Sequence, residues 1–237
     1  MSIVSHPGDG AYMPVRTPES MIRTIMEMGI VPFFINPVAG YSIQELTPGE
    51  LWFNDDDMGP WDWKIEAVRS GDIAYGKFLG GGKSSFASVE YYKHLMNYRR
   101  SLEKYAPEGI AAETLEEIRR NGSGTIRELR QKFGLRKNQM ESVLTRLEMG
   151  TWIVVGDFQR VYHGADLHYS GWQLTSYCTP DELFGGDKPG FSFGPFKGER
   201  RTLDAGCSPE ESYEVLRRRI VELAPMAGAK QVERLLR

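Results

Sequence analysis

Cysteine is scarce in this sequence, since its 237 residues contain only Cys178 and Cys207. The two lie too far apart to form a metal-type cluster, and in a reducing compartment both are expected to be free thiols. No stretch approaches the roughly 18 consecutive apolar residues that a membrane-spanning helix needs. Internal repeats are also absent, which excludes solenoid architectures.

The chain also lacks a targeting pattern and a strong net charge. Its start, MSIVSHPGDG, does not have the basic and then apolar order of a secretory signal, so we expect a cytoplasmic protein. The net charge is only −3, and 41% hydrophobic and 26% charged residues are typical of a soluble globular protein. The length allows one sizeable or two modest domains.

Two short helices joined by a tight turn are expected near the middle of the chain. The first, at 125–133, opens with a capping box, in which Thr125 caps the Glu128 amide and Glu128 reaches back. Gly134 follows at the place where a helix commonly stops. The second is expected at 137–149, where apolar residues recur at i, i+3, i+4 and i+7, namely Met140, Val143, Leu144 and Leu147.

One further helix and two strands flank this pair. Upstream, Leu115 and Ile118 share a face of a helix that ends at 121–122. Downstream, residues 151–155 (TWIVV) are rich in β-formers and residues 172–177 (WQLTSY) alternate as a strand does, with a long loop between them. This order predicts an α+β protein with a winged helix-turn-helix at its centre.

Other elements surround this centre. The expected elements are a helix capped by Thr17, an edge strand at 30–35, a β-hairpin turning at 80–82, a long helix at 87–105, and helices at 208–223 and 229–237. Segments 37–57 and 181–206 are expected to be irregular. We therefore divide the chain into a flexible arm (1–16), an N-terminal α+β lobe (17–106), a winged-helix domain (107–178), and a glycine- and aromatic-rich loop with C-terminal helices (179–237).

The predicted winged helix is basic although the whole chain is slightly acidic. Its basic residues between positions 119 and 146 are Arg119, Arg120, Arg127, Arg130, Lys132, Arg136, Lys137 and Arg146. Only Glu128 and Glu141 oppose these eight, so the local charge is +6. A basic patch of this kind is the electrostatic footprint of contacts with nucleic-acid phosphates.

A winged helix commonly places its third helix in the major groove of duplex DNA. The residues expected to hold phosphates are Arg127, Arg130, Arg136, Lys137 and Arg160. Those expected to contact bases or the groove are Asn138, Gln139, Ser142, Arg146 and, in the wing, His163. The alternatives are a plain solvent-facing surface and a protein-protein interaction module that binds an acidic protein partner. We expect no cofactor, no metal and no membrane partner.

The hairpin region carries a family resemblance. Its residues are Trp61-Asp62-Trp63-Lys64, Tyr75-Gly76-Lys77, Leu79, a glycine turn, Lys83 and the β-run into Ala87-Ser88. This pattern resembles the small bacterial AlkZ-related proteins, which are similar to the winged-helix alkylpurine and crosslink DNA glycosylases. The helix at Thr17, the central winged helix and the helix at Ser208 also resemble that family, so the similarity covers roughly 17–223. The resemblance implies a link to DNA repair.

The large glycosylases carry a Gln-x-Gln or Gln-x-Asp motif that positions the hydrolytic water, and this sequence has neither. Its nearest strings are Gln139-Met140-Glu141 and Gln231-Val232-Glu233. We therefore expect a non-catalytic or weakly catalytic nucleic-acid-binding protein and assign no catalytic residue. The alternative is a DNA glycosylase that acts on alkylated bases with an atypical water-activating residue, for which Asp62 and Glu141 are the candidates.

Other motifs have simple interpretations. Gly82-Lys83-Ser84 lacks the preceding glycine of a phosphate loop and leads into a strand, so a hairpin turn is expected. The acidic run at 55–57 is expected to be a solvated loop. His163, Asp166 and His168 fit no standard metal-site spacing, so we expect a wing that contacts DNA or solvent.

Four aromatic residues of the hairpin region are able to stack on bases, as aromatic platforms do. They are Trp61, Trp63, Tyr75 and Phe78. Because a hairpin that packs against the following helix also needs aromatic side chains, we expect these four to belong to the core.

Overall fold

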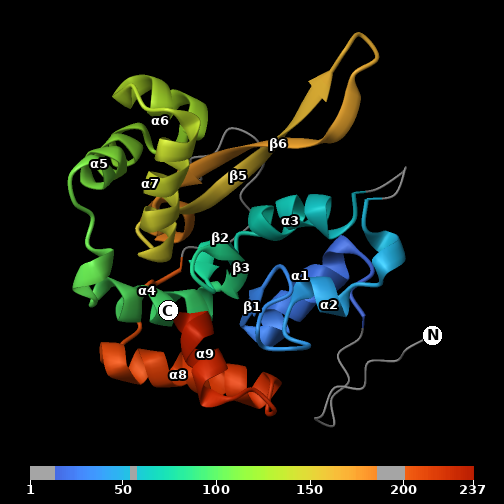
Figure 1. Ribbon diagram of the computed structural model, residues 1–237, viewed down its shortest axis with the longest axis vertical. Coiled ribbons are helices and arrows are strands. Elements are labelled where there is room, and N and C mark those ends of the chain that lie inside the picture. Colours follow the sequence, from blue (N-terminus) through green and yellow to red (C-terminus); the bar gives the residue numbers. More distant parts are fainter. Residues whose placement is uncertain (1–13, 54–57, 186–200) are drawn as a thin grey trace.

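A computed structural model describes residues 14–53, 58–185 and 201–237 of the chain. Within these ranges the protein is α+β, with helices around two small antiparallel sheets of three strands each (Figure 1). The predicted α+β class is therefore confirmed. Most of the predicted arm, the acidic run Asp55–Asp57 and the middle of the loop at 181–206 lie outside the described residues.

The first sheet belongs to the N-terminal half of the chain. Its strands, in the spatial order β1-β3-β2, are β1 (Ile30–Pro32), β2 (Ile73–Leu79) and β3 (Lys83–Ser88). β2 and β3 form the predicted hairpin, and Gly80, Gly81 and Gly82 in its turn all have positive φ. Because positive φ favours glycine, the hairpin turn explains this glycine run.

Helices cover this sheet. They are α1 (Pro18–Met28), α2 (Ile43–Leu46), α3 (Pro60–Arg69) and α4 (Val89–Arg100), with short 3₁₀ turns at Gly49–Leu51 and Glu103–Tyr105. Thr17 caps α1 with Pro18 at its first position, as predicted. The expectation of irregular structure at 37–57 is wrong where α2 forms, and the helix expected at 87–105 is shorter. α3, which carries Trp61 and Lys64, is not among the predicted elements.

The second sheet belongs to the central part of the chain, and its strands lie in the order β4-β6-β5. The elements of this part are α5 (Ile110–Asn121), β4 (Gly124–Thr125), α6 (Ile126–Phe133), α7 (Lys137–Met149), β5 (Val154–His163) and β6 (His168–Cys178). The order is thus helix, strand, helix, helix, strand, strand. The predicted capping box is present, since the Glu128 amide donates to Thr125 Oγ1 (3.3 Å) and the Thr125 amide to Glu128 Oε2 (2.8 Å).

The connection between β5 and β6 differs from the prediction. The sequence predicts strands at 151–155 and 172–177 with a long loop between them, but both strands are longer and pair out to His163 and His168. Only residues 164–167 form the tip. The ribbon extends away from the helices in Figure 1. The pairing register shifts between Val155 and Asp157 and again between Arg160 and Tyr162, and these bulges interrupt the alternation that marks a strand in sequence.

Buried hydrophobic side chains form two clusters. The smaller lies between α5, α6 and α7 and contains Leu115, Ile118, Leu129 and Leu144. The larger fills the N-terminal half and also takes in β5 and β6 side chains, which are Val154, Val155, Phe158 and Cys178. The base of the β5–β6 ribbon therefore packs against the N-terminal sheet, although the two are far apart in sequence.

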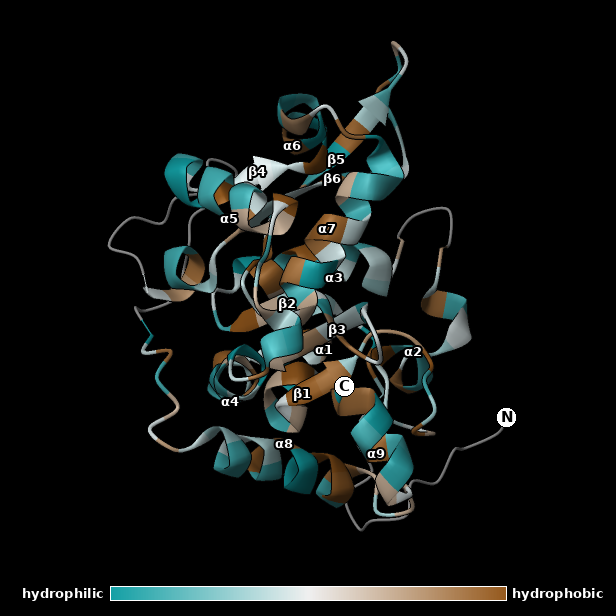
Figure 2. Cartoon of the chain, turned by 60° about the vertical axis from the view of Figure 1, so that its left-hand side comes forward, coloured by the Kyte–Doolittle hydropathy of each residue, from teal (hydrophilic) through white to brown (hydrophobic). Residues whose placement is uncertain are grey.

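The C-terminal helices close the larger cluster. They are α8 (Pro209–Leu223), which packs on α4, and α9 (Ala229–Leu236), and a short π-helical turn occupies Asp181–Gly185. Figure 2 shows that α8 and α9 carry both hydrophilic and hydrophobic residues, as helices with one buried face do. Ser208 caps α8 as predicted. No described helix combines the length and hydrophobicity required to cross a bilayer.

Candidate nucleic-acid interface and adjoining pocket

Four predicted phosphate contacts belong to α6 and to the start of α7. We call Arg127, Arg130, Arg136 and Lys137 the α6–α7 basic surface. All four side chains are exposed, and Arg127 and Arg130 share a face of α6 because they are three residues apart. The three arginines have no acidic partner among the described residues, and Lys137 has only a 3.7 Å pair with Glu141.

Other basic residues of the predicted patch are neutralised by neighbours on α5. Arg119 pairs with Glu116, Arg120 with Glu117 (2.8 Å), and Lys132 with Glu117 (3.5 Å). These glutamates lie just before the window in which the local charge of +6 was counted. The exposed positive charge is therefore concentrated at the α6–α7 basic surface rather than spread along the whole unit.

Three predicted base-facing residues of α7 are exposed, but two of them already accept hydrogen bonds from the backbone. Asn138, Gln139 and Ser142 lie in the first half of the helix and face solvent. Gln139 Oε1 accepts the Arg136 amide (3.0 Å), so Gln139 caps the helix. Asn138 Oδ1 accepts the Gln139 amide (3.0 Å). Ser142 is the member of the three with no such contact among the described residues.

The remaining three predicted contacts lie elsewhere. Arg146 points to the segment before α5, where it pairs with Glu108 (3.9 Å). Arg160 on β5 pairs with Asp62 Oδ2 on α3 (3.1 Å). His163 is exposed at the tip of the ribbon, paired in register with His168. These three do not gather with the α6–α7 basic surface.

Asp62 anchors α3 to the β5–β6 ribbon. Its Oδ1 accepts hydrogen bonds from the Tyr169 hydroxyl (2.6 Å) and from Gln173 Nε2 (2.8 Å), in addition to the Arg160 pair. With 8% of its surface exposed, Asp62 is held on three sides. The other candidate, Glu141, lies on the solvent face of α7.

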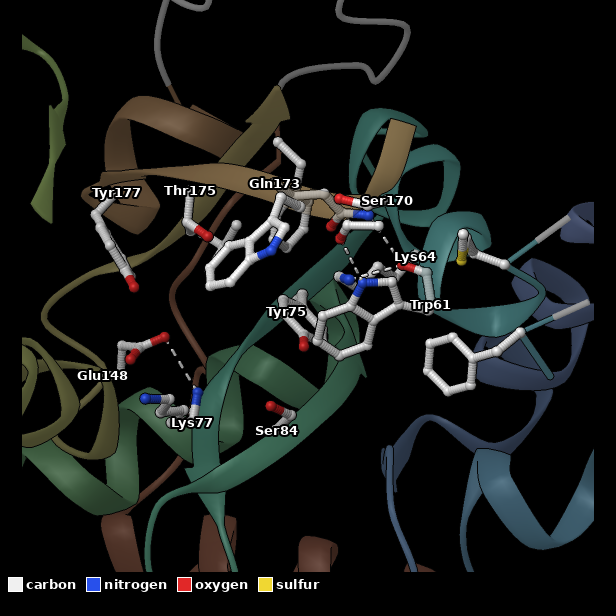
Figure 3. Close-up of a pocket in the computed structure, with 16 residues that line it drawn as sticks. Trp61, Lys64, Tyr75, Lys77, Ser84, Glu148, Ser170, Gln173, Thr175 and Tyr177 are labelled. Carbon is white, nitrogen blue, oxygen red and sulfur yellow. Dashed lines mark hydrogen bonds between the residues drawn. The ribbon is translucent and has the colours of Figure 1, made fainter. Parts of the chain in front are cut away.

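A pocket of about 510 Å³ lies between α3, the β2–β3 hairpin, the end of α7 and the β5–β6 ribbon (Figure 3). Its walls combine aromatic side chains with several polar and charged ones. The residues that matter below are Trp61, Lys64, Tyr75, Glu148, Trp172 and Gln173. The expectation that the hairpin aromatics belong to the core is confirmed for Trp63, Tyr75 and Phe78, which are buried there. Trp61 is only partly buried against the core, and both Trp61 and Tyr75 also line this pocket.

Glu148, at one end of the pocket, is a buried carboxyl with 2% of its surface exposed. Its Oε1 accepts the Lys77 amide (3.2 Å), and its Oε2 has no hydrogen-bond partner among the described residues. Burial raises the pKa of Glu148 to about 7, and the charge and amide of Lys77 oppose this rise. Glu148 therefore exchanges its proton near neutral pH.

Lys64 lies with Trp61 at the other end of the pocket (Figure 3). Its Nζ sits 3.4 Å from the centre of the Trp61 ring and donates to the Trp61 carbonyl (2.6 Å). Burial lowers the pKa of Lys64 to about 7, against the opposing charge of Asp62. One pocket thus holds an acid and a base whose pKa values both approach neutrality, an arrangement that is common at functional sites.

α7 connects this pocket to the basic surface. Positions 138, 141, 145 and 148 follow one another along one side of the helix, because three- and four-residue steps return to the same face. Thr145 meets the hairpin, since Lys77 Nζ lies 3.4 Å from its Oγ1. This side of α7 therefore begins with exposed residues beside the basic surface and ends at the buried Glu148 in the pocket.

Among the described residues, no three His, Cys, Asp or Glu side chains group as metal ligands. Cys178 is buried in the larger cluster, where desolvation raises the pKa of its thiol.

These features define an α+β protein with a basic two-helix surface and an aromatic pocket joined by one helix. The chain belongs to the AlkZ-related family, because the family model described as "AlkZ related" matches residues 15–237. The family resemblance seen in the sequence is thus confirmed, and it indicates a relationship to DNA-repair glycosylases. No curated protein and no solved structure matches the chain.

Proposed function

We propose that this protein binds duplex DNA through a winged helix formed by α5, β4, α6, α7, β5 and β6. The order of these elements supports the assignment, with α7 as the third helix and the β5–β6 ribbon as the wing. The observation that carries the proposal is the exposed Arg127, Arg130 and Arg136 without acidic partners among the described residues. Unpaired arginines at a helix pair suit phosphate contacts.

A charge-reversal experiment tests this proposal. Arg127, Arg130 and Arg136 are changed together to Glu, and binding of a fluorescent duplex is followed by anisotropy over a salt series. Wild type should lose affinity linearly in log salt, and the slope should fall by about 3 in the triple variant, one for each lost phosphate contact.

The matched control reverses three exposed charges far from the interface. Arg218 on α8 and Lys230 and Arg234 on α9 are exposed, and changing them to Glu alters the net charge equally. The control should retain wild-type affinity and slope. Equal losses in both triple variants would show that net charge alone matters, and no binding at low salt would instead favour an acidic protein partner.

Base excision is the second candidate function, and Glu148 is the observation that favours it. Asp62 is held by three partners and Glu141 faces solvent, whereas Glu148 is a buried carboxyl in a pocket with a pKa near neutrality. Ionised Glu148 is able to take a proton from an attacking water. The test is release of free base from alkylated duplex, compared between wild type and Glu148→Gln.

A further inference from the structure

We infer that the pocket between α3, β2, α7 and β6 binds a single nucleobase, unstacked from a nucleic acid that lies on the α6–α7 basic surface. The inference rests on the proposed DNA binding for the approach of the strand. The binding of a base is inferred from the pocket itself, namely from its lining residues and its unpartnered polar atoms. These observations are independent of the basic surface.

The walls suit a flat ring. Trp61 on α3 and Tyr75 on β2 line the pocket from below the ribbon, and Phe158 packs against Tyr75 with ring centres 5.5 Å apart. Trp172 on β6 also lines the pocket, yet 63% of its surface is exposed. An exposed tryptophan beside a buried aromatic floor offers a stacking surface at the pocket mouth, and every base has a face that stacks on it.

The unpartnered polar atoms of the pocket are oxygens, and both accept hydrogen bonds when Glu148 is ionised. Glu148 Oε2 is buried and has no partner among the described residues. Gln173 Oε1 is also buried and has no hydrogen-bond partner among the described residues. The orientation of the Gln173 amide is fixed, because its Nε2 donates to the Asp62 carboxylate, which accepts only. Buried acceptors without donors are costly, so a ligand that brings N–H groups would relieve both.

A nucleobase answers this description. It is planar, it stacks on aromatic side chains, and its Watson–Crick edge carries N–H donors once the base leaves its pair. We infer a base within a polynucleotide because α7 begins beside the basic surface and ends at Glu148. A strand bound to the surface would therefore lie near the pocket. A free nucleoside has the same ring chemistry, and the experiment below separates the two sources.

The experiment compares two fluorescent duplexes that differ by one unpaired, bulged nucleotide. A bulged base costs little to unstack, so the protein should bind that duplex about tenfold more tightly than the paired one. Trp172→Ala should bring this ratio close to one by removing the stacking surface. Leu174→Ala is the control, because Leu174 is exposed on the same strand but does not line the pocket.

Glu148→Gln tests the acceptor. A glutamine has one oxygen where the carboxylate has two, so when that oxygen accepts the Lys77 amide, an NH2 donor instead of an acceptor faces the base N–H. The ratio of the two affinities should fall several-fold. Glutamine preserves the volume of the side chain, and a circular dichroism spectrum like that of wild type verifies the fold.

The outcomes separate the two proposals. If the paired duplex binds and the bulge adds nothing, the pocket inference is overturned while the proposed function stands. If neither duplex binds, the proposed function fails, and titration with free nucleosides, followed by tryptophan fluorescence, decides the pocket. Quenching of tryptophan fluorescence that is lost in Trp172→Ala and weakened in Glu148→Gln would assign the pocket to free nucleosides. If no nucleoside quenches the fluorescence, the inference of a base-binding pocket is overturned.

Discussion

The α6–α7 basic surface and the pocket are built in opposite ways. The surface consists of exposed arginines and a lysine within a short span of sequence, on two helices whose ends are marked by local signals. The pocket draws its lining from several elements that are far apart in sequence, and its ionisable Lys64 and Glu148 are buried. α7 contributes to both, the surface at its start and the pocket at its end.

This difference determines which conditions affect each region. Exposed charges act through a field that salt screens, and they contribute little to folding stability. Buried ionisable groups cost stability in their charged form, so they respond to pH. The surface should therefore be sensitive to salt and the pocket to pH, and each prediction below tests that separation.

The largest expected effect follows from removing Arg99, which fixes the pocket end of α7. Its buried guanidinium donates to the carbonyls of Phe78 (3.1 Å), Leu236 (2.5 Å) and Met149 (3.3 Å) and to the Tyr105 hydroxyl. Arg99→Met leaves these acceptors unpaired and should cost about 3–5 kcal/mol in urea denaturation. The exposed Arg218→Met should cost less than about 0.5 kcal/mol.

The Glu148 carboxyl should make stability depend on pH. Its pKa rises from 4.5 unfolded to about 7 folded, so the folded state keeps its proton longer and stability falls as pH rises between these values. Glu148→Gln removes this loss. The variant should gain about 3 kcal/mol over wild type at pH 8, relative to the difference at pH 4. A difference that is the same at both pH values would contradict the assignment.

A smaller effect is expected at the capping box that starts α6. Thr125→Ala removes the acceptor of the Glu128 amide and should cost about 1 kcal/mol in thermal unfolding. Because α6 carries two of the arginines, frayed helix ends should also weaken duplex binding. Ser142→Ala, an exposed change on α7, is the control for stability and should be close to neutral.

The smallest effect on stability is expected at the surface itself. Changing Arg127, Arg130 and Arg136 to Glu should alter the free energy of unfolding by no more than about 0.5 kcal/mol for each site, because none has an acidic partner among the described residues. The same change should produce the large loss of salt-dependent binding described above. A variant that unfolds would show that the arginines are structural.

The two helices that carry the basic surface were predicted well, because the sequence signals that mark their ends are local. The Thr125–Glu128 capping box and Gly134 bound α6, and the apolar spacing places α7 at Lys137–Met149, as observed. The sequence-based prediction overestimated the charge of the patch because Glu116 and Glu117 neutralise arginines one turn away. Whether the surface binds DNA stays a prediction.

The pocket was not predicted, because distant segments create it. α3 has no side-chain cap, because the residue before it, Gly59, has no side chain. Most residues of α3 are buried, so no amphipathic period marks it. One signal for Glu148 was present: it follows Leu144 by four residues and so falls on the apolar side of α7. A carboxylate there indicates a buried acid, but not what surrounds it.

The measurement that tests the account most directly is a double-mutant cycle on the two duplexes. It combines the triple charge reversal at Arg127, Arg130 and Arg136 with Glu148→Gln. The charge reversal should weaken both duplexes equally and keep the preference for the bulge, Glu148→Gln should reduce that preference, and the combined variant should show the sum of the two free-energy changes. A charge reversal that abolishes the preference while sparing the paired duplex would contradict the division between surface and pocket.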